Sequence, residues 1–290
     1  MEQGPTPPEG PVVGLGPSRF GAAGRAYRRA LARVLRPYSV VQHTVNLDTA
    51  RRLERLEQRV GVPVDGAAPP PGGAWAGHPD GNGAPAVWSP PDLEAAMEEI
   101  FTTADPAVFE SSGRQQAETL QDLFGPQDVV LDVGCGVGRV ARYVAPSCRR
   151  LLAADSSPQM LALARERIGG EAPNISFVTV DGTRLPVGDD AVDLVYSVLV
   201  LQHLEREHAF AMLREIRRVL KRGGRAYLTF PNILSDEYLD TFLGYVRDGE
   251  AADPRRARLY TPQEVERLLP AAGFAIDQLD AGVEIVAVCS

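Results

Sequence analysis

An acidic residue and three glycines stand close together near the middle of the chain. Asp132 is followed by Gly134, Gly136 and Gly138, which gives the spacing DxGxGxG. Glycines in a turn between a strand and a helix let the backbone approach a ligand without a Cβ in the way. The spacing is not the GxGxxG of a dinucleotide site, because Arg139 stands at its last position, and no GK[ST] follows for a phosphate loop. The turn therefore favours a ligand that has an adenosine group and no pyrophosphate.

Acidic residues also end the next two strand-like segments. Asp155 stands 21 residues after Gly134, and Asp181 ends the following segment, with Gly182 and Thr183 directly after it. A carboxylate at the first position can accept hydrogen bonds from both hydroxyls of a ribose. One at the second position can accept a hydrogen bond from an adenine amino group. Three successive strand ends thus offer a glycine turn, a ribose-binding acid and a base-binding acid at one edge of a sheet.

His203 is the candidate for acid–base chemistry. Of the four histidines in the chain, it alone lies in the segment after the fourth predicted strand, Val198 to Leu204. The ordinary pKa of histidine, about 6.5, suits a general base at neutral pH. A histidine here can also cap the following helix or close the wall of a pocket, and these alternatives stay open.

The elements that must position these residues alternate between strand and helix from about residue 92 onward. Short, nearly all-apolar strands are expected at 129–133, 151–154, 175–180, 193–198 and 225–230. Helices are expected at 92–102, 111–124, 138–145, 158–168, 205–220, 235–247 and 262–272. This alternation predicts a parallel sheet that helices cover on both faces. Two closing strands, near 274–279 and 283–288, are joined by so few residues that only an antiparallel hairpin is possible.

Glycine and proline divide the chain into regions. It has 290 residues with 28 Gly and 24 Pro, and half of these lie in 1–24 and 61–91. Such tracts lack the apolar side chains that would offset their chain entropy. We expect a disordered tail at 1–18, an arginine-rich helical segment at 19–60, a linker at 61–91 and the main domain at 92–290. The helical segment can lie on a membrane surface, pack on its own domain, or join two copies as a homodimer; we favour the last two.

Charge and cysteine content exclude several classes of protein. The net charge is −8, and an acidic main domain is a poor partner for nucleic acid. The three cysteines form no CxxC pair, which indicates a reducing cytoplasm, no disulfide framework and no metal cluster. No apolar run is long enough for a transmembrane helix, and the N-terminus lacks the pattern of a secretory signal.

Taken together, these motifs resemble the class I S-adenosylmethionine-dependent methyltransferases, in particular those that act on small molecules or glycans. The resemblance covers about 111–290. It rests on VLDVGCGVGR (130–139), AADSSPQML (153–161), DGTRLPVGDDAVDLVYS (181–197) and VLKRGG (219–224). It implies S-adenosylmethionine as cofactor. It also implies an α/β fold with a doubly wound, seven-stranded, mostly parallel sheet of order 3-2-1-4-5-7-6, in which strand 7 is antiparallel, preceded here by the N-terminal helical extension.

The resemblance further implies roles for individual residues. The methionine part of the cofactor is expected to lie against the turn, formed by Asp132, Gly134, Cys135, Gly136 and Gly138. The ribose and adenine are expected to meet Asp155, Ser156, Met160, Asp181, Gly182, Thr183 and Ser197. Arg114 either binds the cofactor carboxylate or is a solvated helix residue. The segment after the fourth strand faces the methyl donor in this family, so His203 is the expected catalytic base.

The expected activity is methyl transfer to a small-molecule or glycan acceptor, most simply O-methylation in specialised metabolism. Two alternatives stay open: N-methylation of an amine, and cofactor binding without transfer by a sensor or partner subunit. Methylation of nucleic acid is disfavoured, because the segment after the fourth strand lacks the Asn/Asp-Pro-Pro-aromatic motif and the chain has no Pro-Cys dipeptide.

Overall fold

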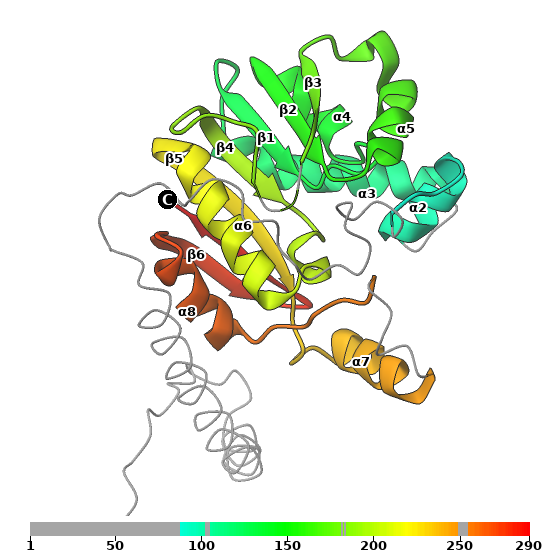
Figure 1. The fold of residues 1–290 in the computed structure, drawn as a ribbon, viewed down its shortest axis with the longest axis vertical. Helices are drawn as coiled ribbons and strands as arrows, with labels where there is room; N and C mark the ends of the chain where they lie inside the picture. Colours follow the sequence, from blue (N-terminus) through cyan, green and yellow to red (C-terminus); the bar gives the residue numbers. More distant parts are fainter. Residues whose placement is uncertain (1–87, 102–104, 181, 183, 249–254) are drawn as a thin grey trace, which may run out of the picture. The chain divides into compact units, whose positions relative to one another are not determined.

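The structure, a computed structural model, describes residues 88–290 except 102–104, 181, 183 and 249–254 (Figure 1). The expected tail, the helical segment and nearly all of the linker lie outside the described residues, as do Asp181 and Thr183 of the expected cofactor site. In the described part of the chain, no helix is long and apolar enough to cross a membrane.

The centre of the described domain is a seven-stranded sheet of order β3-β2-β1-β4-β5-β7-β6. The strands are β1 (Val129–Val133), β2 (Arg150–Asp155), β3 (Ile175–Thr179), β4 (Val192–Ser197), β5 (Leu220–Pro231), β6 (Ile276–Ala281) and β7 (Glu284–Cys289). The first five strands pair in parallel, and β7 pairs antiparallel with both β5 and β6. The predicted order and the predicted antiparallel hairpin are both confirmed.

Helices cover both faces of this sheet (Figure 1). The α-helices of the described residues are α2 (Leu93–Phe101), α3 (Pro106–Leu120), α4 (Ala141–Val144), α5 (Pro158–Ile168), α6 (Arg206–Val219), α7 (Asp236–Asp248) and α8 (Pro262–Ala271), and all but α7 lie against the sheet or against one another. Buried side chains of α6 and α8 join one apolar core with β1, β4, β5 and β7, and those of α3 and α4 join a second core on the other face. Burial on both faces explains why the central strands β1 and β4 are mostly apolar.

Three predicted elements differ clearly from the structure. The helix expected at 111–124 is Pro106–Leu120, with Asp105 as its N-cap. The helix expected at 138–145 is only Ala141–Val144, because Gly138 has a φ of +76° and still belongs to the turn. The fifth strand begins at Leu220, not at 225, and the helix before it ends at Val219. Leu220 pairs with Val192 and Arg225 with Leu194, so the residues between them form an irregularity within the strand.

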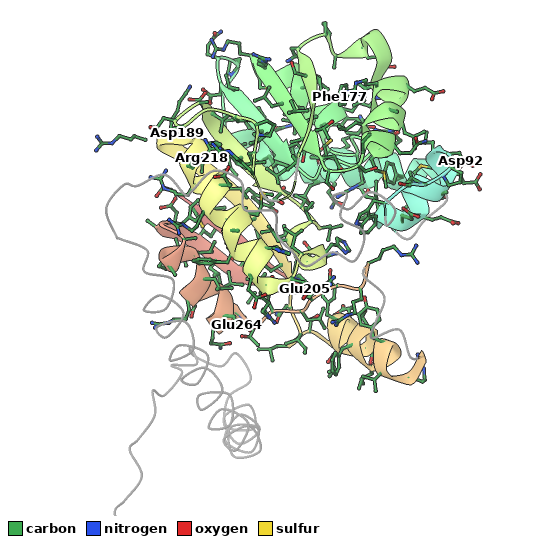
Figure 2. The ribbon with its side chains drawn as sticks, viewed as in Figure 1. Asp92, Phe177, Asp189, Glu205, Arg218 and Glu264 are labelled. Carbon is green, nitrogen blue, oxygen red and sulfur yellow. The ribbon has the colours of Figure 1, made fainter. Side chains whose placement is uncertain are left out.

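The loop that leads from β3 into β4 is held by a side chain of α6. Arg218 forms an ion pair of 2.6 Å with Asp189, and Figure 2 shows the two residues together at one end of α6. The same guanidinium donates to the carbonyl oxygens of Leu185 and Val187. This contact fixes the loop that follows the expected adenine-binding acid.

Candidate active site

The glycine turn after β1 has the conformation that its sequence predicts. Gly134, Gly136 and Gly138 have φ values of +79°, +53° and +76°, a region that side chains rarely adopt. The amides of Gly134 and Cys135 both donate to the carbonyl oxygen of Ala154, at 2.7 and 2.9 Å. Two backbone hydrogen bonds therefore fasten the turn to the end of β2.

Asp155, at the end of β2, faces this turn. Its Oδ2 accepts from the amide of Gly136 and its Oδ1 from the amide of Ser157, both at 2.8 Å. Burial raises the pKa of Asp155, and these backbone hydrogen bonds oppose that rise. Because a carboxylate offers about four acceptor positions, two remain for the hydroxyls of a ribose. The carboxylate and the side-chain-free turn beside it thus fit an adenosyl cofactor.

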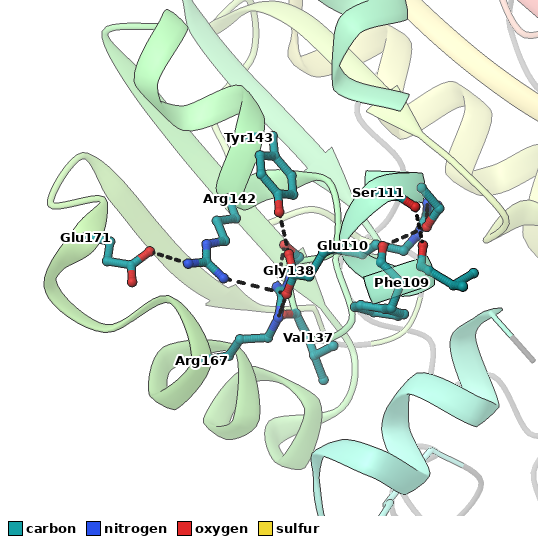
Figure 3. Close-up of polar contacts among 12 residues, drawn as sticks. Phe109, Glu110, Ser111, Val137, Gly138, Arg142, Tyr143, Arg167 and Glu171 are labelled. Atoms are coloured by element: carbon teal, nitrogen blue, oxygen red, sulfur yellow. Dashed lines mark hydrogen bonds and ion pairs between the residues drawn. The ribbon is translucent and has the colours of Figure 1, made fainter. Parts of the chain in front are cut away.

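A buried arginine from α5 supports the glycine turn from behind (Figure 3). Arg167 donates from Nη1 to the carbonyl oxygens of Val137 and Gly138, at 3.1 and 3.0 Å. Its Nη2 lies 2.6 Å from Oε1 of Glu110, a residue of α3 that also accepts from the hydroxyl of Tyr143. Burial raises the pKa of Glu110, but the hydrogen bonds from Tyr143 and Arg167 outweigh it and hold this pKa below its usual value. The sequence analysis did not assign a role to Arg167 or Glu110.

Three of the expected cofactor residues are buried beneath the turn. Asp132 is 4% exposed, accepts from the hydroxyl of Tyr196 at 2.9 Å, and has a pKa that burial raises to about 7. Ser197 is fully buried and donates to the carbonyl oxygen of Val133. Burial also raises the pKa of the Cys135 thiol well above its usual value, so this cysteine stays protonated. The hydrogen bonds of Asp132 and Ser197 join the ends of β1 and β4 next to the turn.

The segment before α2 reaches across the strand ends. The hydroxyl of Ser157 donates to the carbonyl oxygen of Trp88, and the ring of Trp88 stands edge-on to that of His203, with centroids 4.9 Å apart. Met160, expected beside the ribose, is buried in a cluster that α2 shares. Its neighbour Ser156, also expected there, is exposed. The Ser157 hydroxyl additionally caps α5 by accepting from the amide of Met160.

His203 lies after β4, where it was expected, and both of its ring nitrogens have partners. Nδ1 is 2.8 Å from the carbonyl oxygen of Arg255, so Nδ1 carries a proton and donates. Nε2 is 3.1 Å from Nε2 of Gln202 and accepts from that amide. Burial lowers the pKa of His203 to about 4. At neutral pH the ring is therefore uncharged.

A cavity of about 250 Å³ opens at the same edge of the sheet. It is lined by Phe101, Ser112, Gln115, Gln116, Thr119, Arg139, Val198, Leu199 and Glu284. Arg139, which directly follows the glycine turn, is 5% exposed and donates to the hydroxyl of Ser112. Glu284 is the first residue of β7, and burial raises its pKa although Arg139 and the hydroxyl of Tyr238 lower it. The cavity thus presents one cation and one acid beside the turn.

The backbone is strained where β4 meets this cavity. Leu199 has a φ of +61°, a left-handed conformation that a leucine adopts only when its surroundings enforce it. Its amide donates to the hydroxyl of Thr229, which is 2% exposed. Strain of this kind often occurs at binding sites, which agrees with the position of Leu199 in the cavity wall.

For Arg114 the sequence left open a cofactor contact and a solvated position on a helix, and its position in the structure agrees with the second. Its guanidinium stands over the ring of Tyr143 in α4, 5.1 Å from the centroid, and the residue is exposed. The guanidinium that lines the cavity belongs instead to Arg139. Glu284 was missed because it lies in an ordinary strand sequence far from any motif, and only the pairing of β7 with β5 brings it to this edge.

Comparison with known proteins agrees with this geometry. Residues 130–224 match the family model described as a methyltransferase domain. The methyltransferase GfsG of Streptomyces halstedii is 32% identical over 42% of this chain and 46% of its own length. The malonyl-[acyl-carrier protein] O-methyltransferase of Marinomonas sp. strain MWYL1 is 37% identical over 37% of this chain and 38% of its own length. The chain thus spans less than half the length of these two relatives.

The fold also has counterparts among solved structures. The magnesium protoporphyrin IX methyltransferase of Synechocystis PCC 6803, solved with bound SAH, superimposes with a TM-score of 0.52. The match covers 65% of this chain and 86% of that one at 22% identity, so it concerns the fold alone. The sheet order, the glycine turn with Asp155 and the match over residues 130–224 together identify the described domain as a methyltransferase domain of the class I, S-adenosylmethionine-dependent type.

Proposed function

We propose that the protein transfers a methyl group from S-adenosylmethionine to an oxygen of a small-molecule or glycan acceptor. The observation that carries this proposal is the cavity beside the glycine turn, in which buried Arg139 and partly buried Glu284 stand together. Its volume of about 250 Å³ is near the lower end for small-molecule sites. A small polar acceptor group fits such a space, with the remaining N–H groups of Arg139 available for its oxygens.

S-adenosylmethionine is the cofactor of this family and supplies a methyl group on a positively charged sulfur. In this proposal Asp155 binds the ribose hydroxyls, and Gly134, Gly136 and Gly138 allow close approach of the ligand. The roles expected for Asp181, Gly182 and Thr183 at the adenine remain part of the proposal. Catalysis then consists largely of aligning the acceptor in a site that excludes water.

Two side chains are candidates for accepting the acceptor's proton. His203 stands in the expected segment, but its low pKa and the bond from Gln202 leave it a weak base. Glu284 lines the cavity itself, and its raised pKa makes its carboxylate a better proton acceptor than an ordinary one. Both are retained as proposals, and His203→Ala and Glu284→Gln separate them. The variant of the true base loses about 100-fold or more in rate, and the other loses less than about tenfold.

Some relatives are O-methyltransferases, which supports an oxygen acceptor, whereas others are C-methyltransferases by name. One of them acts on a malonyl-[acyl-carrier protein] as an O-methyltransferase, whereas a 36% identical relative in Clavibacter sepedonicus is a demethylmenaquinone methyltransferase. N-methylation of an amine and cofactor binding without transfer are the alternatives. We also propose a cytoplasmic location, since Cys135, Cys148 and Cys289 are all buried and free.

The first experiment measures binding of S-adenosylhomocysteine by calorimetry, and the absence of binding would sink the proposal. The second incubates the protein with S-adenosylmethionine and sets of hydroxylated, amine and glycan acceptors, with S-adenosylhomocysteine as the measured product. Turnover of a hydroxylated acceptor supports the proposal. Turnover of amines alone supports N-methylation, and binding without turnover favours the non-catalytic alternative.

A further inference from the structure

Helix α7 carries a row of exposed apolar side chains. Leu239, Phe242, Leu243 and Val246 are 41%, 41%, 50% and 64% exposed. Their spacing of three and four residues places them on one face of the helix. None of the α7 side chains that the structure describes, 236–247, is buried. An apolar face of this size on a helix indicates a surface that another molecule covers.

The opposite flank of α7 is the one that contacts its own domain, and it does so through tyrosine hydroxyls. The hydroxyl of Tyr238 lies 3.5 Å from Oε1 of Glu284, and that of Tyr245 accepts from the amide of Ala257 at 3.1 Å. Figure 1 shows α7 projecting beyond the end of the sheet, away from the layers formed by the other helices. A helix of 13 residues is marginal in water unless it buries an apolar face.

We propose that a second copy of this chain covers α7, with the two α7 helices packed antiparallel about a two-fold axis. The row is self-complementary in this arrangement. An axis between Phe242 and Leu243 places each of these side chains against the other in the second copy. It also places Leu239 against Val246. Contacts of this kind, in which the same patch serves both copies, are typical of two-fold symmetric dimers.

The charges beside the apolar row favour the antiparallel direction. Asp236 and Asp240 lie near the start of α7 and Arg247 near its end, and at 100° per residue all three fall on one flank of the helix. Antiparallel packing brings the acidic start of one helix to Arg247 of the other on the same side of the pair. In a parallel two-fold pair the charged flanks lie on opposite sides and do not meet. The helix dipoles are also opposed in the antiparallel pair, which is the favourable arrangement.

Dimerisation here would stiffen the wall of the acceptor cavity. The same helix that presents the apolar row holds Tyr238 beside Glu284, and Glu284 lines the cavity. A second copy that fixes α7 therefore also limits the movement of this acid. This dimer differs from the one that the sequence favours, through the N-terminal helical segment, and the two can be separated by experiment.

The test measures the molar mass of the full chain by size-exclusion chromatography with light scattering over a range of micromolar concentrations. The wild type is expected at twice the mass of the chain. Leu243→Glu places two like charges across the axis and is expected to raise the dissociation constant by about 30-fold or more. Val108→Glu is the matched control, because Val108 is 45% exposed on a different helix and receives the same charge.

A charge exchange tests the direction of packing. Arg247→Glu is expected to raise the dissociation constant, and the double variant Asp240→Arg with Arg247→Glu is expected to restore it. Circular dichroism and binding of S-adenosylhomocysteine show that each variant is folded. A monomeric wild type overturns the proposal. A dimer that Leu243→Glu leaves intact also overturns it and points to the N-terminal segment, and failure of the double variant to recover overturns the antiparallel arrangement.

Discussion

The cofactor side and the acceptor side of the sheet edge are built from different groups of atoms. On the cofactor side, backbone amides and carbonyls do most of the binding: they fasten the glycine turn to β2, engage Asp155 and receive Arg167. On the acceptor side, the cavity is lined by side chains from α2, α3, the segment after β4 and β7. A position with an unusual backbone conformation accepts only a few residue types. A position that contributes only a side chain to the cavity accepts many. This difference explains why one cofactor can serve many acceptors.

The largest effect is expected from a side chain placed in the glycine turn. A Cβ at Gly134 would lie 2.3 Å from Cγ2 of Val200, in addition to the cost of a φ of +79°. Gly134→Ala should therefore lower the free energy of unfolding by about 2–5 kcal/mol, which urea denaturation measures. Gly182→Ala is the control, since its φ is +63° but no atom lies within 4 Å, and about 1–2 kcal/mol is expected. Equal effects would show that the packing against Val200 is unimportant.

The next effect concerns the support of the turn. Arg167→Met removes the side-chain donor to the carbonyl oxygens of Val137 and Gly138, of which Gly138 keeps the amide of Arg142. It also leaves Glu110 without its closest cation. We expect a loss of about 3 kcal/mol in the free energy of unfolding and weaker binding of S-adenosylhomocysteine. Arg142→Met removes a cation from the same cluster, but Arg142 is 31% exposed and should cost less than about 1 kcal/mol. If the two variants behave alike, the turn does not depend on Arg167.

A matched pair of acid-to-amide changes compares the two sides directly. Asp155→Asn should weaken binding of S-adenosylhomocysteine by roughly 10- to 100-fold, because the charged acceptor for the ribose hydroxyls is lost. Glu284→Gln should leave this affinity within about twofold, as expected for a residue outside the cofactor contacts. Calorimetry on the two variants decides the matter. A large loss with Glu284→Gln would place that acid on the cofactor side and weaken the division of the edge into two halves.

The smallest net effect is expected from a change of pH, because the shifted pKa values of two groups change the free energy of unfolding in opposite directions. The pKa of Asp132 is raised to about 7, so the folded state holds the extra proton and stability falls as pH rises from about 4 to 7. The pKa of His203 is lowered to about 4, so the unfolded state binds the extra proton and stability rises with pH from about 4 to 6.5.

Single variants separate the contributions of Asp132 and His203 to the pH dependence of stability. Relative to the wild type, Asp132→Asn should become more stable as pH rises through this window, and His203→Gln should become less stable. Denaturation curves at several pH values between 4 and 7 measure both differences. Differences that do not change with pH would mean that neither group has the shifted pKa described here.

The sequence predicts the conformation of the glycine turn well and the lining of the cavity poorly, for one physical reason. Gly134, Gly136, Gly138 and Asp155 are fixed by local backbone needs, and such needs recur at fixed spacing in the chain. Arg139 and Glu284 meet only because β7 pairs with β5 after a long insertion. Nothing at residue 284 distinguishes it locally from any other strand residue, so its position is visible only in the folded sheet.

The fold shows the same pattern. The final hairpin was predictable from its short connection, whereas the strand order was predictable only through the resemblance to a known family. Arg114 and Arg139 show the limit of such reasoning: both are arginines near the turn, yet one stacks on Tyr143 at the surface and the other is buried at the cavity. The position of each side chain depends on which residues of the neighbouring helices pack against it. The spacing of residues in the sequence does not show this packing.

The reversed direction of β7 has a consequence for how such a protein can change its substrate. In the parallel strands the last residue reaches the site, but in β7 it is the first, Glu284, which follows directly on the hairpin turn at Gly282 and Val283. Insertions or exchanges in this short turn would therefore reshape the acceptor cavity while leaving every segment of the cofactor turn untouched. The hairpin is thus a natural place for directed evolution of new acceptor preferences.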